Sequence, residues 1–246
     1  MSQTIAARTH RTTTCDRQLG VTRSLLGWGV VAGPLYVAVW LAQALTRDGF
    51  DLRRHPASVL SNGDLGWIQI TNFLVTGVMV VAVAVGVRRA VRSGCGRRWT
   101  ARLIAAFGVG LVVAGIFRAD PADGFPPGTP VGPVVTMSWH AGLHYTFASV
   151  GFVALILACF VLGRRFAALG QPRWVAFSVT TGVVFLAVLV AAASGLTGAT
   201  VNVLGLSVAI ILAWSWLAAV SAHLMTDATY ERHLPAASTT PEGKPS

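Results

Sequence analysis

The chain has few charged residues, few acids and few cysteines, and each shortage excludes a class of protein. Only 11% of its 246 residues are charged, whereas a soluble domain has about 25%, so water is not its main solvent. Three cysteines without a Cys-x-x-Cys pair argue against a disulfide framework. With nine acids the net charge is +10, but the basic residues stand at the ends of apolar runs, which argues against nucleic-acid binding.

Long apolar runs are what the chain has instead. A hydrocarbon layer of about 30 Å requires about 20 apolar residues, and a span in lipid must be helical because lipid cannot satisfy free backbone groups. Gly29-x-x-x-Gly33 in the first run predicts a close helix contact. We therefore predict an all-α, polytopic integral membrane bundle of about six transmembrane helices, near residues 24–45, 67–87, 102–118, 139–163, 174–195 and 201–222.

The distribution of arginine and lysine predicts the orientation of the bundle. Fifteen lie in the two tails and the connections after the second and fourth runs, and four lie on the other side. Such residues favour cytoplasmic loops, so we predict a multi-pass protein of the bacterial plasma membrane with both termini in the cytoplasm. The expected divisions are a basic N-tail (1–23), an uncleaved six-span domain (24–222) and a flexible C-tail (223–246).

Two extracytoplasmic connections carry most of the candidate site residues. The first, at 46–66, holds Asp51, His55 and Ser58 among three arginines and three aspartates, and predicts an ordered, ion-paired lid. Ser58 lacks a nucleophile motif and is also a candidate helix cap. The second connection begins with Arg118 and Asp120, and its prolines restrict the backbone. Arg118 is the expected counter-ion of Asp120.

The second apolar run carries three polar residues, Gln69, Asn72 and Thr76, at spacings of three and four. This spacing places them on one helix face. A polar side chain inside the membrane seeks a partner. They either line a polar cavity below the first connection or hold two helices together.

The fourth run opens with His140 and His144, one helical turn apart. Two imidazoles so placed can reach one metal ion, and Asp51, His55 and Asp120 could complete a divalent-metal site. The Glu of a His-Glu-x-x-His motif is missing. Buried packing histidines are the competing interpretation, and no other cofactor is evident.

The motifs together resemble the bacterial membrane family catalogued as "domain of unknown function 998". The resemblance rests on Gly-Phe-Asp at 49–51, Asp-Pro at 120–121 with Gly-Phe-Pro at 124–126, and Trp-His-x-x-x-His at 139–144. It implies a multi-span membrane protein without an assigned activity. A looser likeness links Ser58, Asp120, His140 and His144 to the zinc sites of the alkaline ceramidases, which have seven spans and a differently placed histidine pair.

Three functions remain open from the sequence. The first is a membrane protein whose Asp, His and Arg cluster binds a small-molecule or lipid ligand or stabilises the bundle. The second is a metal-dependent hydrolase of the outer leaflet, in which the metal would activate water. The third is a small transporter, although ionisable residues at the outer margin rather than the midplane argue against ion coupling. The bilayer is the expected partner, and the sequence leaves the oligomeric state open.

Overall fold

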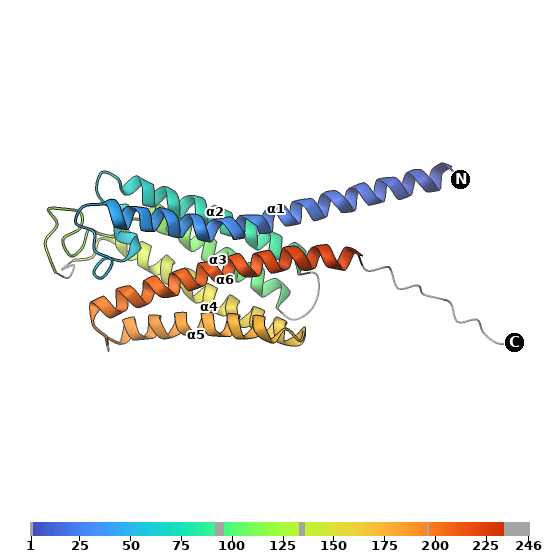
Figure 1. Ribbon diagram of the computed structural model, residues 1–246. Coiled ribbons are helices and arrows are strands. Elements are labelled where there is room, and N and C mark those ends of the chain that lie inside the picture. Colours follow the sequence, from blue (N-terminus) through green and yellow to red (C-terminus); the bar gives the residue numbers. More distant parts are fainter. Residues whose placement is uncertain (1, 92–95, 133–135, 196, 234–246) are drawn as a thin grey trace.

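The computed structural model describes residues 2–91, 96–132, 136–195 and 197–233, and over these ranges the regular structure is helical. Six long helices and one short 3₁₀ helix follow one another along the chain (Figure 1). They are α1 (Ser2–Thr46), η1 (Ala57–Ser61), α2 (Gly66–Ala90), α3 (Arg97–Ile116), α4 (Trp139–Ala168), α5 (Pro172–Ser194) and α6 (Ala199–His233).

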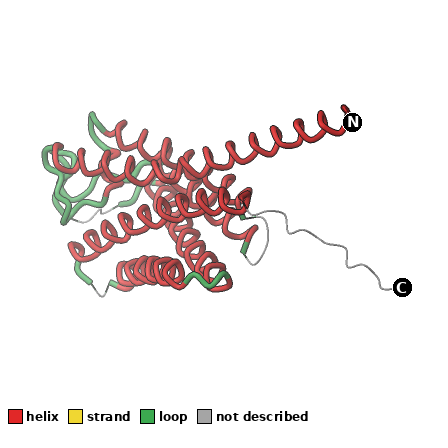
Figure 2. The backbone as a smooth tube through the Cα atoms, turned by 45° about the vertical axis from the view of Figure 1, so that its right-hand side comes forward, coloured by secondary structure: helices red, strands yellow, loops and turns green. Residues whose placement is uncertain are grey.

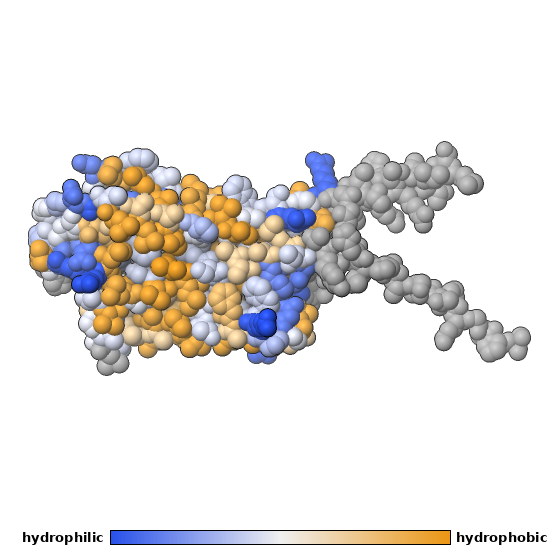
Figure 3. Space-filling view, viewed as in Figure 1, coloured by the Kyte–Doolittle hydropathy of each residue, from blue (hydrophilic) through white to orange (hydrophobic). Residues whose placement is uncertain are grey.

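Each long helix contains a segment that is long and apolar enough to cross a membrane, which confirms the predicted all-α bundle of six spans. The helices exceed the predicted spans mainly at the end that carries the termini. The basic N-tail continues α1 as helix, and α6 extends to His233 before residues 234–246, which lie outside the described part. In space-filling view, hydrophobic residues form a broad belt between two polar ends (Figure 3).

The start of α1 and the end of α6 lie at the same end of the bundle, as an even number of spans requires (Figure 1). The opposite end carries the connections 47–65 and 117–138, which we call the cap. Figure 2 shows the cap as loops gathered over the ends of α1, α2 and α3. Which end faces the cytoplasm remains a prediction from the arginine and lysine distribution.

The helices pack mainly with their neighbours in sequence, and α6 closes the bundle by packing against α1. Small residues allow close approach. Gly29 and Gly33 of α1 contact Ser221 and Trp214 of α6, which confirms the predicted close helix contact. Helices α2 and α3 meet at Gly77, where an added Cβ would lie 2.8 Å from the carbonyl oxygen of Gly108.

Candidate functional site

The first connection of the cap is held in place by Arg47, the residue directly after α1. Its guanidinium donates hydrogen bonds to the carbonyl oxygens of Leu60 and Asn62, each at 2.5 Å. The same group lies over the Phe125 ring, 4.8 Å from its centroid. Burial lowers the pKa of Arg47, and nearby Asp64 acts in the opposite direction. Arg47 therefore ties both connections of the cap to the end of α1.

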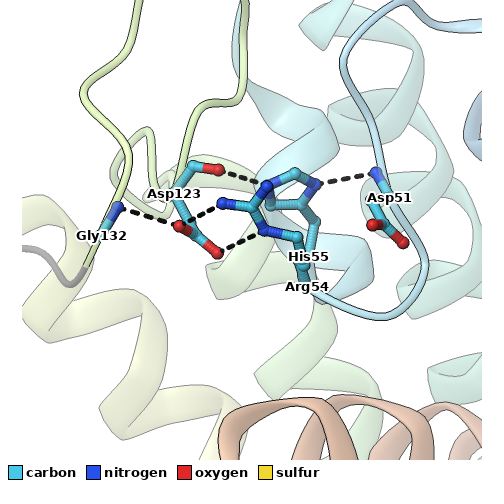
Figure 4. A network of polar contacts seen from close by, with 5 residues as sticks. All are labelled: Asp51, Arg54, His55, Asp123 and Gly132. Atoms are coloured by element: carbon cyan, nitrogen blue, oxygen red, sulfur yellow. Dashed lines mark hydrogen bonds and ion pairs between the residues drawn. The ribbon is translucent and has the colours of Figure 1, made fainter.

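His55 lies at the centre of the cap and is 2% exposed. The backbone N–H of Asp51 donates to its Nδ1 at 2.9 Å, so Nε2 carries the proton and donates to the carbonyl oxygen of Asp123 at 3.0 Å (Figure 4). The rings of Phe50 and Phe125 lie 5.3 and 5.7 Å from the imidazole. With both ring nitrogens hydrogen-bonded to the backbone, His55 holds the two connections together and has no nitrogen left for a metal ion.

Arg54 and Asp123 form the ion pair that joins the two connections across the cap surface. The guanidinium donates through Nε and one terminal nitrogen to the two carboxylate oxygens, at 2.9 and 2.7 Å (Figure 4). The backbone N–H of Gly132 donates to the same carboxylate at 2.9 Å. These contacts, led by Arg54, lower the pKa of Asp123 to about 2. These contacts form the ordered, ion-paired lid that the density of charges predicts.

The pKa of Asp123 predicts how the cap responds to acid. Because this pKa is about 2 in the folded chain and 3.8 for an ordinary Asp, the carboxylate stabilises the fold above about pH 4 and loses this effect as the pH falls toward 2. We expect the thermal midpoint of the purified protein to fall between pH 5 and pH 2, and to fall less in Asp123→Asn. Asp48→Asn, in the exposed part of the first connection, is the control. An Asp123→Asn protein with the full wild-type acid dependence would contradict this assignment.

Asp120 binds Ser138, the residue that caps the start of α4. One carboxylate oxygen accepts from the backbone N–H of Ser138 at 2.8 Å, and the other accepts from its hydroxyl at 2.6 Å. The Ser138 hydroxyl in turn accepts from the N–H of Ala141, 3.1 Å away, at the first turn of the helix. The described residues show no ion pair between Arg118, which is exposed, and Asp120, so the pairing of these two residues stays a prediction.

The two histidines of α4 have different environments. His140 is exposed, with its ring 3.6 Å from that of Trp139. His144 is 2% exposed, and its Nδ1 lies 2.9 Å from the carbonyl oxygen of Ala114 and 2.8 Å from that of Phe117. Among the described residues, no group of three or more His, Cys, Asp or Glu is arranged to hold a metal ion. Asp51, His55 and Asp120 thus add no ligands to this pair.

The polar residues of α2 face α1. Asn72 donates to the carbonyl oxygen of Tyr36 at 3.1 Å, and Gln43 donates to the side-chain oxygen of Gln69 at 2.9 Å. The Thr76 hydroxyl donates to the carbonyl oxygen of Asn72, 2.6 Å away, within its own helix. All of these side chains are buried. Gln69 and Asn72 thus hold α2 against α1, and Gln69, Asn72 and Thr76 do not line the cavity described next.

An apolar cavity of about 150 Å³ lies beneath the cap, inside the bundle. Its walls come from η1 and from all six helices. At the cap end it is lined by Ser58 of η1 and by His144 and Tyr145 of α4. Deeper in the bundle the lining is apolar and includes Leu111, Phe152, Leu155, Phe185, Leu206 and Ile210. Of the predicted site residues, only Ser58 and His144 meet in this cavity.

The sequence-based prediction missed two elements of this end of the molecule. The sequence does not single out Asp123, although this residue lies inside the Asp-Gly-Phe-Pro element; its carboxylate binds Arg54 and its backbone carbonyl oxygen binds His55. By its position in the sequence Arg47 is only one charge of a connection, although in the structure it holds the cap to α1. The repeated acids and arginines of the two connections were the available signal, but their pairing could not be read from spacing.

Comparison with known proteins identifies the family. The family "Protein of unknown function (DUF998)" matches residues 30–223, which covers most of the chain, including the whole of spans two to five and part of the first and sixth. The chain therefore belongs to this family, as the motifs of the cap and of α4 predict. No curated protein and no solved structure matches the chain.

Proposed function

We propose that this DUF998 protein binds a membrane lipid and holds part of the lipid's hydrocarbon chain in the cavity beneath the cap. The observation that carries the proposal is the apolar cavity inside a membrane-spanning bundle. Cavities of about 150 Å³ with Leu, Ile and Phe walls accept benzene-sized apolar groups. The volume here is thus sufficient for a segment of one chain, not for a whole lipid.

The shape of the cavity suits a hydrocarbon chain of a lipid that runs parallel to the helices. Its lining on α4 extends from His144 to Leu155, which is about 16 Å at a helical rise of 1.5 Å per residue. On α6 it extends from Leu206 to Trp214. Such a cavity reaches from the cap into the middle of the bundle, along the direction that lipid chains take in a bilayer.

The lipid would enter from the side of the bundle, between α4 and α6. These two helices are joined mainly through α5 rather than by direct contact. The part of α5 nearest the cap, residues 186–194, has no buried residue. Four lining residues on α4 and α6 are partly exposed there: Ala148, Phe152, Leu206 and Ile210. The hydrocarbon chain of a lipid can therefore pass from the bilayer into the cavity without crossing the polar cap.

The polar cluster has a different task in this proposal. Asp51, His55 and Asp123 are bonded within the cap, and Asp120 is bonded to the start of α4. The cluster would thus stabilise the roof of the cavity rather than bind the ligand. With the arginine-rich connections in the cytoplasm, the cavity would open to the outer leaflet of a bacterial plasma membrane.

Lipid binding fits the geometry better than the two other functions. A metal-dependent hydrolase would need ligands around His144, and the described residues supply no third one. Ion-coupled transport would need charged groups near the midplane, where the described lining of the cavity is uncharged.

Photo-crosslinking with a lipid that carries a diazirine on its chain tests the proposal. The probe is added at low mole fraction to vesicles of unlabelled phospholipid that contain the protein, and adducts are mapped by peptide mass spectrometry. We expect adducts on the buried lining residues Leu111 and Ala213 as well as on lipid-facing Val150, which is 56% exposed. Adducts confined to lipid-facing residues would refute the proposal.

A variant that fills the cavity supplies the matched control. Ala148→Phe places a large side chain at a lining position, so we expect the adducts on Leu111 and Ala213 to fall severalfold while that on Val150 is retained. Val150→Phe, on the exposed face of the same helix, should leave the interior adducts unchanged. Interior adducts that persist in Ala148→Phe would mean that the chain does not occupy this cavity.

A further inference from the structure

His144 presents an unpaired acceptor nitrogen at the cap end of the cavity. Its Nδ1 lies within 2.9 Å of two carbonyl oxygens, those of Ala114 and Phe117. Carbonyl oxygens only accept, so Nδ1 carries a proton, and in the neutral imidazole Nε2 is then an acceptor. The ring is 2% exposed and lines the cavity, and Nε2 bonds to none of the described residues. Nε2 is not one of the fully enclosed side-chain atoms that lack a partner, so a donor on a ligand can reach it from the cavity. An acceptor inside an apolar cavity is stabilised by such a donor.

The cavity contains no charge that would attract an anionic head group. Within the described residues, no Arg, Lys, Asp or Glu lines it. Of the arginines of the cap, Arg47 binds backbone carbonyls and Arg54 binds Asp123, while Arg53 and Arg118 are exposed and do not line the cavity. His144 lies five residues into α4, about 7.5 Å along the helix. An ionised phosphate or carboxylate at that depth would be desolvated without a counter-ion, at a high cost in free energy.

We infer that the lipid held in this cavity has a neutral hydroxyl head group, which donates a hydrogen bond to Nε2 of His144. This inference rests on the proposed function and specifies its ligand class: long-chain alcohols and acylglycerols with a free hydroxyl, rather than anionic phospholipids or fatty acids. Ser58 and Tyr145, which carry hydroxyl groups, line the same end of the cavity. Each can donate or accept, so either can satisfy the lone pairs of the ligand's oxygen.

Competition between lipids that share a chain and differ in the head group tests the inference. The protein is crosslinked with the diazirine probe while an unlabelled long-chain alcohol, its methyl ether or the matching fatty acid is added. The ether occupies the same space but cannot donate. One neutral hydrogen bond corresponds to about a three- to tenfold difference in affinity. We expect the alcohol to halve the Leu111 and Ala213 adducts at a mole fraction about three- to tenfold lower than the ether or the fatty acid requires.

His144→Asn identifies the acceptor. An asparagine side chain can keep an N–H donor near the position of Nδ1, so the carbonyl oxygens of Ala114 and Phe117 retain a partner, while Nε2 is lost. We expect the preference for the alcohol over the ether to fall to about one. Equal competition by alcohol and ether in the wild-type protein, or an unchanged preference in His144→Asn, would overturn the inference and leave lipid binding intact. Failure of all three lipids to reduce the interior adducts would overturn the proposed function as well.

Discussion

Replacing Arg47 by alanine is expected to lower the free energy of unfolding by about 2–3 kcal/mol. A hydrogen bond from a charged donor is worth about 1.5–3 kcal/mol, and the two bonds of Arg47 contribute less than their sum because the side chain is partly exposed. The change leaves the carbonyl oxygens of Leu60 and Asn62 without their donor and removes the cation from the face of Phe125. Since Arg47 joins the cap to α1, the cap should also become sensitive to protease before the helices do. Denaturant unfolding in detergent micelles and limited proteolysis measure the two effects.

Arg53→Ala is the matched control for this prediction. Arg53 lies in the same connection and is exposed, and its backbone N–H donates to the Asp51 carboxylate, while its guanidinium bonds to none of the residues that the structure describes. An exposed side chain of this kind contributes within about 0.5 kcal/mol. If Arg47→Ala and Arg53→Ala changed stability equally, the cap would not be held through the contacts of the Arg47 guanidinium.

Replacing Gly77 by leucine is expected to separate α2 from α3, at a cost of about 3 kcal/mol or more, near the upper end of what overpacking causes. A Cβ at this position would lie 2.8 Å from the carbonyl oxygen of Gly108 and 2.9 Å from the backbone nitrogen of Val112. These are backbone atoms of a helix, so they cannot move aside as a flexible side chain would. We expect a large loss of monodisperse protein in size-exclusion chromatography and a lower thermal midpoint.

Gly27→Leu provides the comparison, because an added Cβ at Gly27 of α1 meets nothing within 4 Å. Leucine also has the higher helix propensity, by about 0.8–1 kcal/mol at most. The Gly27 variant should therefore be as stable as the wild-type protein or slightly more stable. A Gly77→Leu protein that behaves like Gly27→Leu would show that the close approach of α2 and α3 is not needed for folding.

The six spans and the helix contact at Gly29 and Gly33 could be predicted from the sequence because both depend on local features. A run of about 20 apolar residues must bury its backbone polar groups in its own hydrogen bonds, whatever the rest of the chain does. Two glycines one helical turn apart form a smooth face on any helix. The match of the family to residues 30–223 agrees with this reading.

The roles of the polar residues could not be predicted in the same way. His140 and His144 are equivalent by spacing, yet one is exposed and the other is buried against the end of α3. Asp120 and Arg118 are neighbours in sequence, yet Asp120 binds Ser138. Each outcome depends on which group from a distant segment the tertiary packing places within hydrogen-bonding distance.

The sequence by itself thus determined a six-span helical membrane protein with both termini at one end, because hydrophobic run length and helix geometry act within a single segment. Only the tertiary structure decided that Arg54 meets Asp123 across 69 positions, that His55 is bonded through both nitrogens, and that Ser58 and His144 meet at one cavity. The physical reason is that hydrogen bonds and ion pairs act over about 3 Å, so a polar residue acquires its role only when packing has brought its partner there.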